Sequence, residues 1–136
     1  MSTVTCIMKE KGKVVSKQLD YDSTTHKFIT LLTPDMFLTE DEIVNDLFLN
    51  RLNQEDIDYL SKMKKDDVIM LHHGFGTSIR NQYGLWFEEN PYTVLNDVMA
   101  DNFPDQVSHR ILEKMWEGIQ PKSLYNAYDK AKRDLT

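Results

Sequence analysis

The first thirty residues alternate between apolar and polar positions as a half-buried β-strand does. Apolar side chains recur at every second position over residues 4–8, and the Lys11-Gly12-Lys13 run that follows has the composition of a turn. The alternation resumes over residues 15–21, and a further β-prone run covers residues 28–32. The pattern predicts two or three antiparallel strands. Because so small a sheet is not stable alone, it must pack on the rest of the chain.

Helical signals begin after Pro34. Thr39-x-x-Glu42 has the form of a capping box and precedes apolar residues at helical spacing over residues 43–48. Asn53-x-x-Asp56 has the same form and precedes a second apolar stripe that ends at Met63. A third helix is expected to begin at Asp66 or Asp67. Its apolar stripe comprises Val68, Leu71, Phe75 and Ile79.

Prolines mark three further predicted helices, because proline is tolerated in the first turn. Asn90-Pro91 predicts one that carries the apolar residues Tyr92, Leu95, Val98 and Met99. Pro104 predicts another that ends near Gly118, and Pro121 predicts a last one. The expected fold class is therefore α+β, with short N-terminal antiparallel β-strands packed on a body of five or six helices. Residues 1–136 are expected to form a single domain, strand-rich over 1–33 and helical over 34–136.

The composition is that of an ordinary globular protein, with 40% hydrophobic and 28% charged residues among 136. No apolar run approaches the roughly 18 residues that cross a bilayer, and the N-terminus lacks the features of a secretory signal. Cys6 is the one cysteine, so an internal disulfide is excluded and nothing indicates an oxidising compartment. We expect a cytoplasmic protein that does not span a membrane. The sequence does not indicate an oligomeric state.

The net charge of −6 bears on which class of macromolecule the chain could bind. Non-specific binding to nucleic acid needs a basic surface that displaces counterions, so nucleic acid is disfavoured as a partner. An acidic surface can serve a basic protein partner, although a solvated face that keeps the chain soluble is the more ordinary interpretation.

The segment richest in candidate chemistry is residues 71–86, which hold three of the five glycines and two of the four histidines. On a helix, His72, Gly76 and Arg80 would lie on one side at i, i+4 and i+8. In a binding interpretation, the missing side chain of Gly76 leaves open space for a ligand, like the floor of a shallow site. Arg80 binds a carboxylate or phosphate there through two parallel hydrogen bonds. A packing interpretation, which we prefer, places Gly76 at a close helix contact. The candidate binding residues are His72, His73, Gly76, Arg80, Asn81 and Trp86.

Other chemistries have weaker support. A strand at residues 68–71, a glycine loop and a helix N-terminus could bind phosphate, but the spacing matches neither Gly-x-Gly-x-x-Gly nor a P-loop. His72 and His73 would point about 100° apart on a helix, and no paired-cysteine or His-Glu-x-x-His motif exists. We therefore predict no metal site, no cofactor and no catalytic residue.

The run Leu71-His72-x-x-x-Gly76-x-x-Ile79-Arg80-Asn81-x-x-Gly84-Leu85-Trp86 resembles the signature of a small bacterial family of unknown function. The resemblance extends to the segment around Pro104-Asp105-x-Val107-Ser108 and covers about residues 34–119. His73 and Gly74 do not belong to that signature, which weakens the glycine-loop interpretation. The resemblance implies a mainly helical body, and it brings no activity or cofactor.

Two functions from different classes follow from the sequence. The first is a non-enzymatic protein-interaction module, a regulator or inhibitor of another protein, which fits a small acidic chain without a complete catalytic constellation. The alternative is a small enzyme or an anion- or nucleotide-binding protein. In that case the His72/Arg80/Asn81 cluster would be its site, with Arg80 holding the anion and His72 acting as acid or base.

Overall fold

A computed structural model describes residues 2–120 of the chain. Its N-terminal part is a three-stranded antiparallel sheet in the order β1-β2-β3, formed by Ser2–Glu10, Lys13–Asp22 and Lys27–Phe28. Lys11 and Gly12 both have positive φ, of 52° and 77°, which is the backbone of a two-residue turn whose twist matches the strands. The predicted antiparallel strands are confirmed, although the third strand is shorter than the run at residues 28–32 suggested.

Strand β1 buries side chains on both faces. Cys6 and Met8 pack with Leu19 and Phe37 in one cluster, whereas Ile7 points the other way into the main core. The sheet therefore packs on the helical body, as its small size required. Cys6 is fully buried in this cluster, and burial raises the pKa of its thiol to about 12.

Both predicted capping boxes are present. Helix α1, Glu40–Asp46, begins where the amide of Glu42 donates to Thr39 Oγ1 at 3.2 Å and the amide of Thr39 donates to Glu42 Oε1 at 3.0 Å. Helix α2, Gln54–Ser61, is capped by Asn53 and Asp56 in the same reciprocal way. A π-helical segment, Leu47–Arg51, connects the two helices.

The predicted third helix is a run of three kinds of turn. A 3-10 segment at Lys65–Leu71 passes into a π-helical segment at His72–Gly76 and then into helix α3, Thr77–Gln82. The chain returns to a regular helix in α4, Pro104–Ile119. A further 3-10 turn, Pro34–Met36, joins the sheet to α1.

The expectation of five or six helices is not supported, because residues 2–120 contain four α-helices. The helix predicted after Asn90-Pro91 is wrong. Asn90 is buried and uses its side chain locally: its amide donates to the carbonyl of Gly84 and its Oδ1 accepts from the amide of Tyr92. Such side-chain bonds compete with helical backbone bonds. The helix predicted after Pro121 lies outside the described residues.

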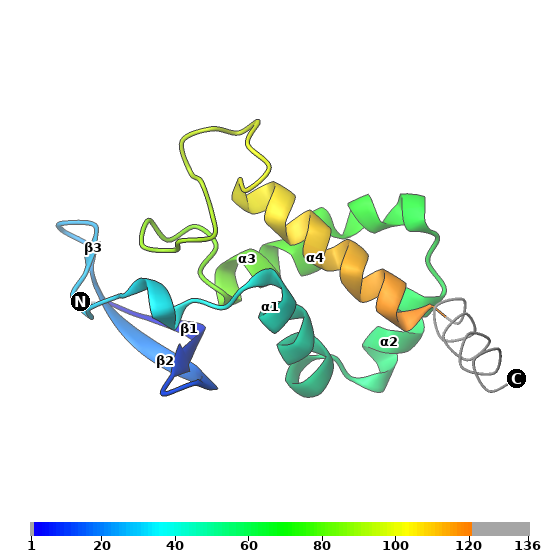
Figure 1. Ribbon diagram of the computed structural model, residues 1–136, viewed down its shortest axis with the longest axis horizontal. Helices are drawn as coiled ribbons and strands as arrows, with labels where there is room; N and C mark the ends of the chain where they lie inside the picture. The colour runs from blue at the N-terminus through cyan, green and yellow to red at the C-terminus, as the bar shows by residue number, and fades with distance from the viewer. Residues whose placement is uncertain (1, 121–136) are drawn as a thin grey trace, which may run out of the picture.

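Helix α4 runs across the helical body, with α1, α2 and α3 beside it and the sheet at one end of the molecule (Figure 1). Its buried stripe forms the centre of the main core, which also takes residues from β1 and from every helix. The α4 residues of this stripe are Val107, Ile111, Leu112 and Met115. The long segment between α3 and α4 has no helix and projects from the body (Figure 1).

A carboxylate lies within this core. The side chain of Asp46, on α1, is only 1% exposed and accepts hydrogen bonds from Tyr83 Oη at 2.5 Å, Asn50 Nδ2 at 2.7 Å and Arg51 Nε at 3.2 Å. Burial by itself raises the pKa of Asp46, but these three donors outweigh it and hold the pKa below its ordinary value. Burial raises the pKa of Tyr83, and its hydrogen bond to Asp46 raises that pKa further.

This network predicts an acid-dependent loss of stability. The folded-state pKa of Asp46 lies below the value of about 3.9 in the unfolded chain, so its contribution is fully present above that value and is lost as the pH falls through the folded-state pKa. We expect the difference in unfolding free energy between wild type and Asp46→Asn to stay constant from about pH 8 to pH 5 and to shrink below about pH 4. Urea denaturation at each pH measures it, and a difference independent of pH would contradict the assignment.

Candidate functional site

The Arg80 side chain, on α3, is directed into its own chain. Nη1 donates to Ser108 Oγ at 2.8 Å and lies 3.3 Å from His72 Nδ1, while Nη2 donates to the carbonyl of His72 at 3.1 Å and to Thr77 Oγ1 at 3.0 Å. Nε lies 3.6 Å from the carboxylate of Asp105. The residue is 6% exposed. Each nitrogen of the guanidinium therefore faces a partner within the fold.

His72 is tied to the same cluster. A guanidinium has no acceptor, so His72 Nδ1 must accept the contact from Arg80, and the proton of the neutral imidazole is then on Nε2. Nε2 lies 3.9 Å from Asp105, whose carboxylate thus faces both side chains. The spacing of His72 and Arg80 predicted that they share a side of the helix, and the structure places them in contact.

Gly76 lies beneath this contact. A Cβ built on Gly76 would lie 3.0 Å from Arg80 Nη1, 3.4 Å from the carbonyl oxygen of Leu71 and 3.7 Å from Leu112. The floor that the binding interpretation left open is thus covered by the Arg80 guanidinium and by α4. The position has the close approach that the packing interpretation required.

We expect Gly76→Ala to lower the free energy of unfolding by about 1–3 kcal/mol, because the added methyl would lie 3.0 Å from Arg80 Nη1 and must shift a guanidinium that its hydrogen bonds hold in place. Gly74→Ala is the matched control. Gly74 lies in the same π-helical segment, and a Cβ there would meet nothing within 4 Å. Alanine at position 74 should be neutral or stabilising by up to about 1 kcal/mol. Thermal and urea denaturation measure both variants, and equal effects of the two substitutions would contradict this packing.

The side chains of the other candidate binding residues form no hydrogen bond or ion pair with Arg80, although the His73 ring packs edge-on against that of His72, with centroids 5.1 Å apart. His73 and Asn81 are exposed, and the Asn81 side chain makes no hydrogen bond to any residue in 2–120. Trp86 is 43% exposed and packs edge-on against Phe103, with ring centroids 5.3 Å apart. An open hollow of about 360 Å³ adjoins His72, His73, Asp105 and His109. Within the described part of the chain, no three His, Cys, Asp or Glu side chains are grouped to hold a metal ion.

The sequence did not identify Ser108 and Asp105 as partners of Arg80. Ser108 is fully buried and also donates to the carbonyl of Asp105 at 3.1 Å. Both residues belong to the segment Pro104-Asp105-x-Val107-Ser108 through which the chain resembles a family of unknown function. The family resemblance therefore pointed to Asp105 and Ser108. Residue spacing could not, because both lie at least 25 residues from Arg80 in the sequence.

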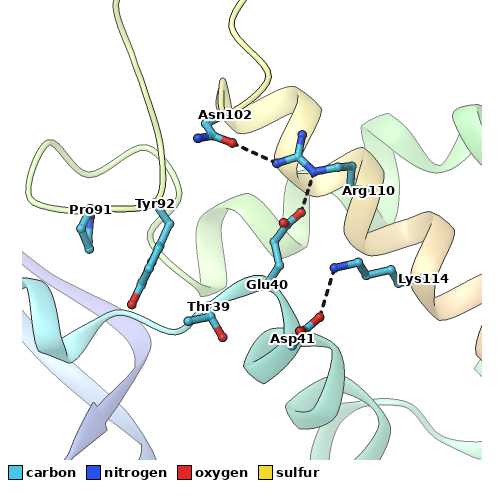
Figure 2. A pocket seen from close by; sticks show the side chains of 8 residues that line it. All are labelled: Thr39, Glu40, Asp41, Pro91, Tyr92, Asn102, Arg110 and Lys114. Atoms are coloured by element: carbon cyan, nitrogen blue, oxygen red, sulfur yellow. Dashed lines mark hydrogen bonds and ion pairs between the residues drawn. The ribbon is translucent and has the colours of Figure 1, made fainter.

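A second feature is the segment over residues 94–102, here called the 94–102 loop. Its base is closed by the amide of Val94, which donates to the carbonyl of Asn102 at 2.9 Å. Arg110 on α4 holds this base, since it donates to the carbonyl of Asp101, to Asn102 Oδ1 at 3.2 Å and to Glu40 at 2.8 Å. Figure 2 shows Arg110 between Asn102 and Glu40.

The hollow drawn in Figure 2, of about 320 Å³, is lined by charges that are already paired. Arg110 binds Glu40, and Lys114 Nζ lies 3.1 Å from Asp41. The tip of the 94–102 loop is different in character, because Val98 is 66% exposed and Met99 is 86% exposed. The loop thus has an anchored, polar base and an apolar tip.

Comparisons with known proteins give a family and no activity. A family model described as "Domain of unknown function (DUF6794)" matches residues 45–118, which is more than half of the chain. The match lies inside the range over which the chain resembles a family of unknown function. No curated protein and no solved structure matches. None of the helices in residues 2–120 is long and apolar enough to cross a membrane.

Proposed function

We propose that this chain, which belongs to the DUF6794 family, is a non-enzymatic protein-interaction module. Its contact with the partner is the 94–102 loop. The observation that carries the proposal is the apolar tip at Val98 and Met99 on a base that Arg110 holds. Binding residues are often found on loops that a rigid scaffold positions. An anchored base also lowers the conformational entropy that docking must remove.

The tip has chemistry that suits a protein partner. Val98 and Met99 are large apolar side chains exposed to water, and their burial against another protein would be favourable. Methionine in particular adapts to an irregular apolar surface. The flanking Asp97 accepts from the amide of Met99 at 3.0 Å, so a turn presents the two side chains. A regulator or inhibitor of another protein would use such a tip as its anchor.

The alternative, an anion or nucleotide site at His72, Arg80 and Asn81, lacks a free donor at its centre. Each nitrogen of the Arg80 guanidinium already faces an acceptor within the chain. We expect nucleotides and phosphorylated metabolites to leave the melting temperature unchanged. A ligand present at a hundred times its Kd would stabilise the fold by about 2.7 kcal/mol, so a clear shift would favour the alternative.

A comparison of matched variants tests the proposal. Immobilised wild-type protein, Val98→Asp/Met99→Asp and Leu49→Asp are exposed to a lysate of the natural host, and retained proteins are quantified. Leu49 is the control because it is 80% exposed but lies in the segment between α1 and α2. We expect a partner retained by wild type and by Leu49→Asp, with at least about a tenfold loss for the double variant. Equal retention by all three proteins, or no retained protein, would contradict the proposal.

A further inference from the structure

A third hollow, of about 440 Å³, lies between the β2–β3 hairpin and the segment that follows α3. Four aromatic side chains line it: Tyr21 and Phe28 from the hairpin, and Trp86 and Phe87 from the segment. More than fifty residues separate the two pairs in the sequence, so no local motif could have predicted this grouping. We call it the aromatic pocket.

Packing in the core fixes the aromatic walls. The Phe28 ring centroid lies 5.2 Å from that of Tyr21 and 4.7 Å from that of Phe87. Phe87 in turn packs edge-on against the buried Phe37, at 6.1 Å. Trp86 is held by its contact with Phe103 and leaves 43% of its surface exposed. The walls are thus preformed, and a ligand would not have to assemble them.

Charged side chains complete the lining of the aromatic pocket. Glu88 and Glu89 are exposed and form no ion pair or side-chain hydrogen bond with any other residue of 2–120. Lys27 stands on the hairpin side and likewise has no ion pair among the described residues, while His26 is 3.4 Å from the Tyr21 hydroxyl. Two carboxylates and one ammonium line the pocket in a chain of net charge −6, and this balance of charge favours a cationic ligand.

We propose that the aromatic pocket binds the guanidinium of an arginine side chain from a protein partner. This inference rests on the proposed function, since it takes the chain to be an interaction module, but the site is separate from the 94–102 loop. Guanidinium is planar and weakly hydrated, stacks on aromatic faces and pairs with carboxylates through two parallel hydrogen bonds. The walls supply the aromatic faces, and Glu88 and Glu89 supply the carboxylates. The volume also accommodates the aliphatic stem of the arginine.

The two tryptophans allow a direct test by NMR. The indole N–H of Trp86 reports on the pocket, whereas that of Trp116 donates to the carbonyl of Met63 at 2.7 Å and serves as an internal control. The probe is an acetylated, amidated Gly-Gly-Arg-Gly-Gly peptide, titrated to millimolar concentration. We expect a saturable shift of the Trp86 resonance alone. A peptide with citrulline in place of arginine, which keeps the shape without the charge, should leave both resonances unmoved.

Charge variants give opposite expected effects. Glu88→Gln/Glu89→Gln should weaken arginine-peptide binding by about three- to tenfold, while Lys27→Gln should leave it equal or tighten it by about twofold. All these side chains are exposed, so the melting temperature checks that the fold is unchanged. Equal affinity for the citrulline peptide, equal affinity for a lysine peptide, or weaker binding by Lys27→Gln would each overturn the guanidinium assignment.

The Val98→Asp/Met99→Asp variant separates the two proposals. It leaves the aromatic pocket intact, so it should bind the arginine peptide as wild type does. If it loses its lysate partner while no peptide shifts Trp86, the loop proposal stands and the arginine site is wrong. If the peptide binds but the loop substitution does not affect capture, the arginine site stands and the loop proposal is wrong.

Discussion

Asp46→Ala is expected to lower the free energy of unfolding by about 3 kcal/mol, more than the loss expected for Arg80→Lys. The substitution removes the acceptor of three hydrogen bonds and leaves the buried hydroxyl of Tyr83 without its 2.5 Å partner. Water cannot replace that acceptor readily, because Tyr83 is 1% exposed. Urea denaturation followed by circular dichroism measures the loss.

A matched control is Asp41→Ala, on the same helix. Asp41 pairs with Lys114 at 3.1 Å, but its side chain is 86% exposed, so we expect a change below about 0.5 kcal/mol. Tyr83→Phe should cost about 1–2 kcal/mol in the wild-type protein and almost nothing in the Asp46→Ala background. Additive effects of the two substitutions would show that the hydroxyl and the carboxylate do not depend on one another.

The parts of the fold that local chemistry decides were predictable from the sequence. The capping boxes at Thr39 and Asn53 are formed by side chains three residues from their partners, and both are present. The turn at Lys11-Gly12 is equally local. A short range between partners is what makes such features visible, because the two residues that bond are read together.

The segment after Asn90 shows where the same reasoning fails. Asn90-Pro91 has the composition of a helix start. However, the Asn90 side chain donates a hydrogen bond to the carbonyl of Gly84, six residues earlier in the chain. The apolar spacing over residues 92–99 then reads as a helix face, whereas Val98 and Met99 are exposed at a loop tip. Periodicity predicts a buried stripe only when another element covers it.

Tertiary partners likewise decide the role of Arg80. Helical spacing placed His72, Gly76 and Arg80 together, and the structure agrees. Whether the guanidinium points to solvent or into the fold depends on Ser108, 28 residues away. The aromatic pocket depends on still longer separations. Sequence patterns therefore predicted which residues cluster around Arg80, but not that its guanidinium points into the fold.

Arg80→Lys is expected to lower the free energy of unfolding by about 2 kcal/mol. The ammonium group has three donors in place of five and cannot reach Ser108, Thr77 and the carbonyl of His72 in the fixed geometry of the fork. Arg80 is 6% exposed, so acceptors left unpaired are poorly hydrated. Denaturation curves measure the loss, and the arginine peptide should still shift Trp86, because the aromatic pocket does not include Arg80.

Ser108→Ala provides the matched test of this structural role. It removes the acceptor that lies 2.8 Å from Nη1, in the second turn of α4, and should cost about 1 kcal/mol in the wild-type protein. In the Arg80→Lys background the same substitution should cost less, because the bond is already lost. If Arg80→Lys instead keeps wild-type stability within about 0.5 kcal/mol and Ser108→Ala has the same effect in both backgrounds, the guanidinium is not held by the fold. Arg80 would then be available to an anion, and the alternative function would gain the free donor that it now lacks.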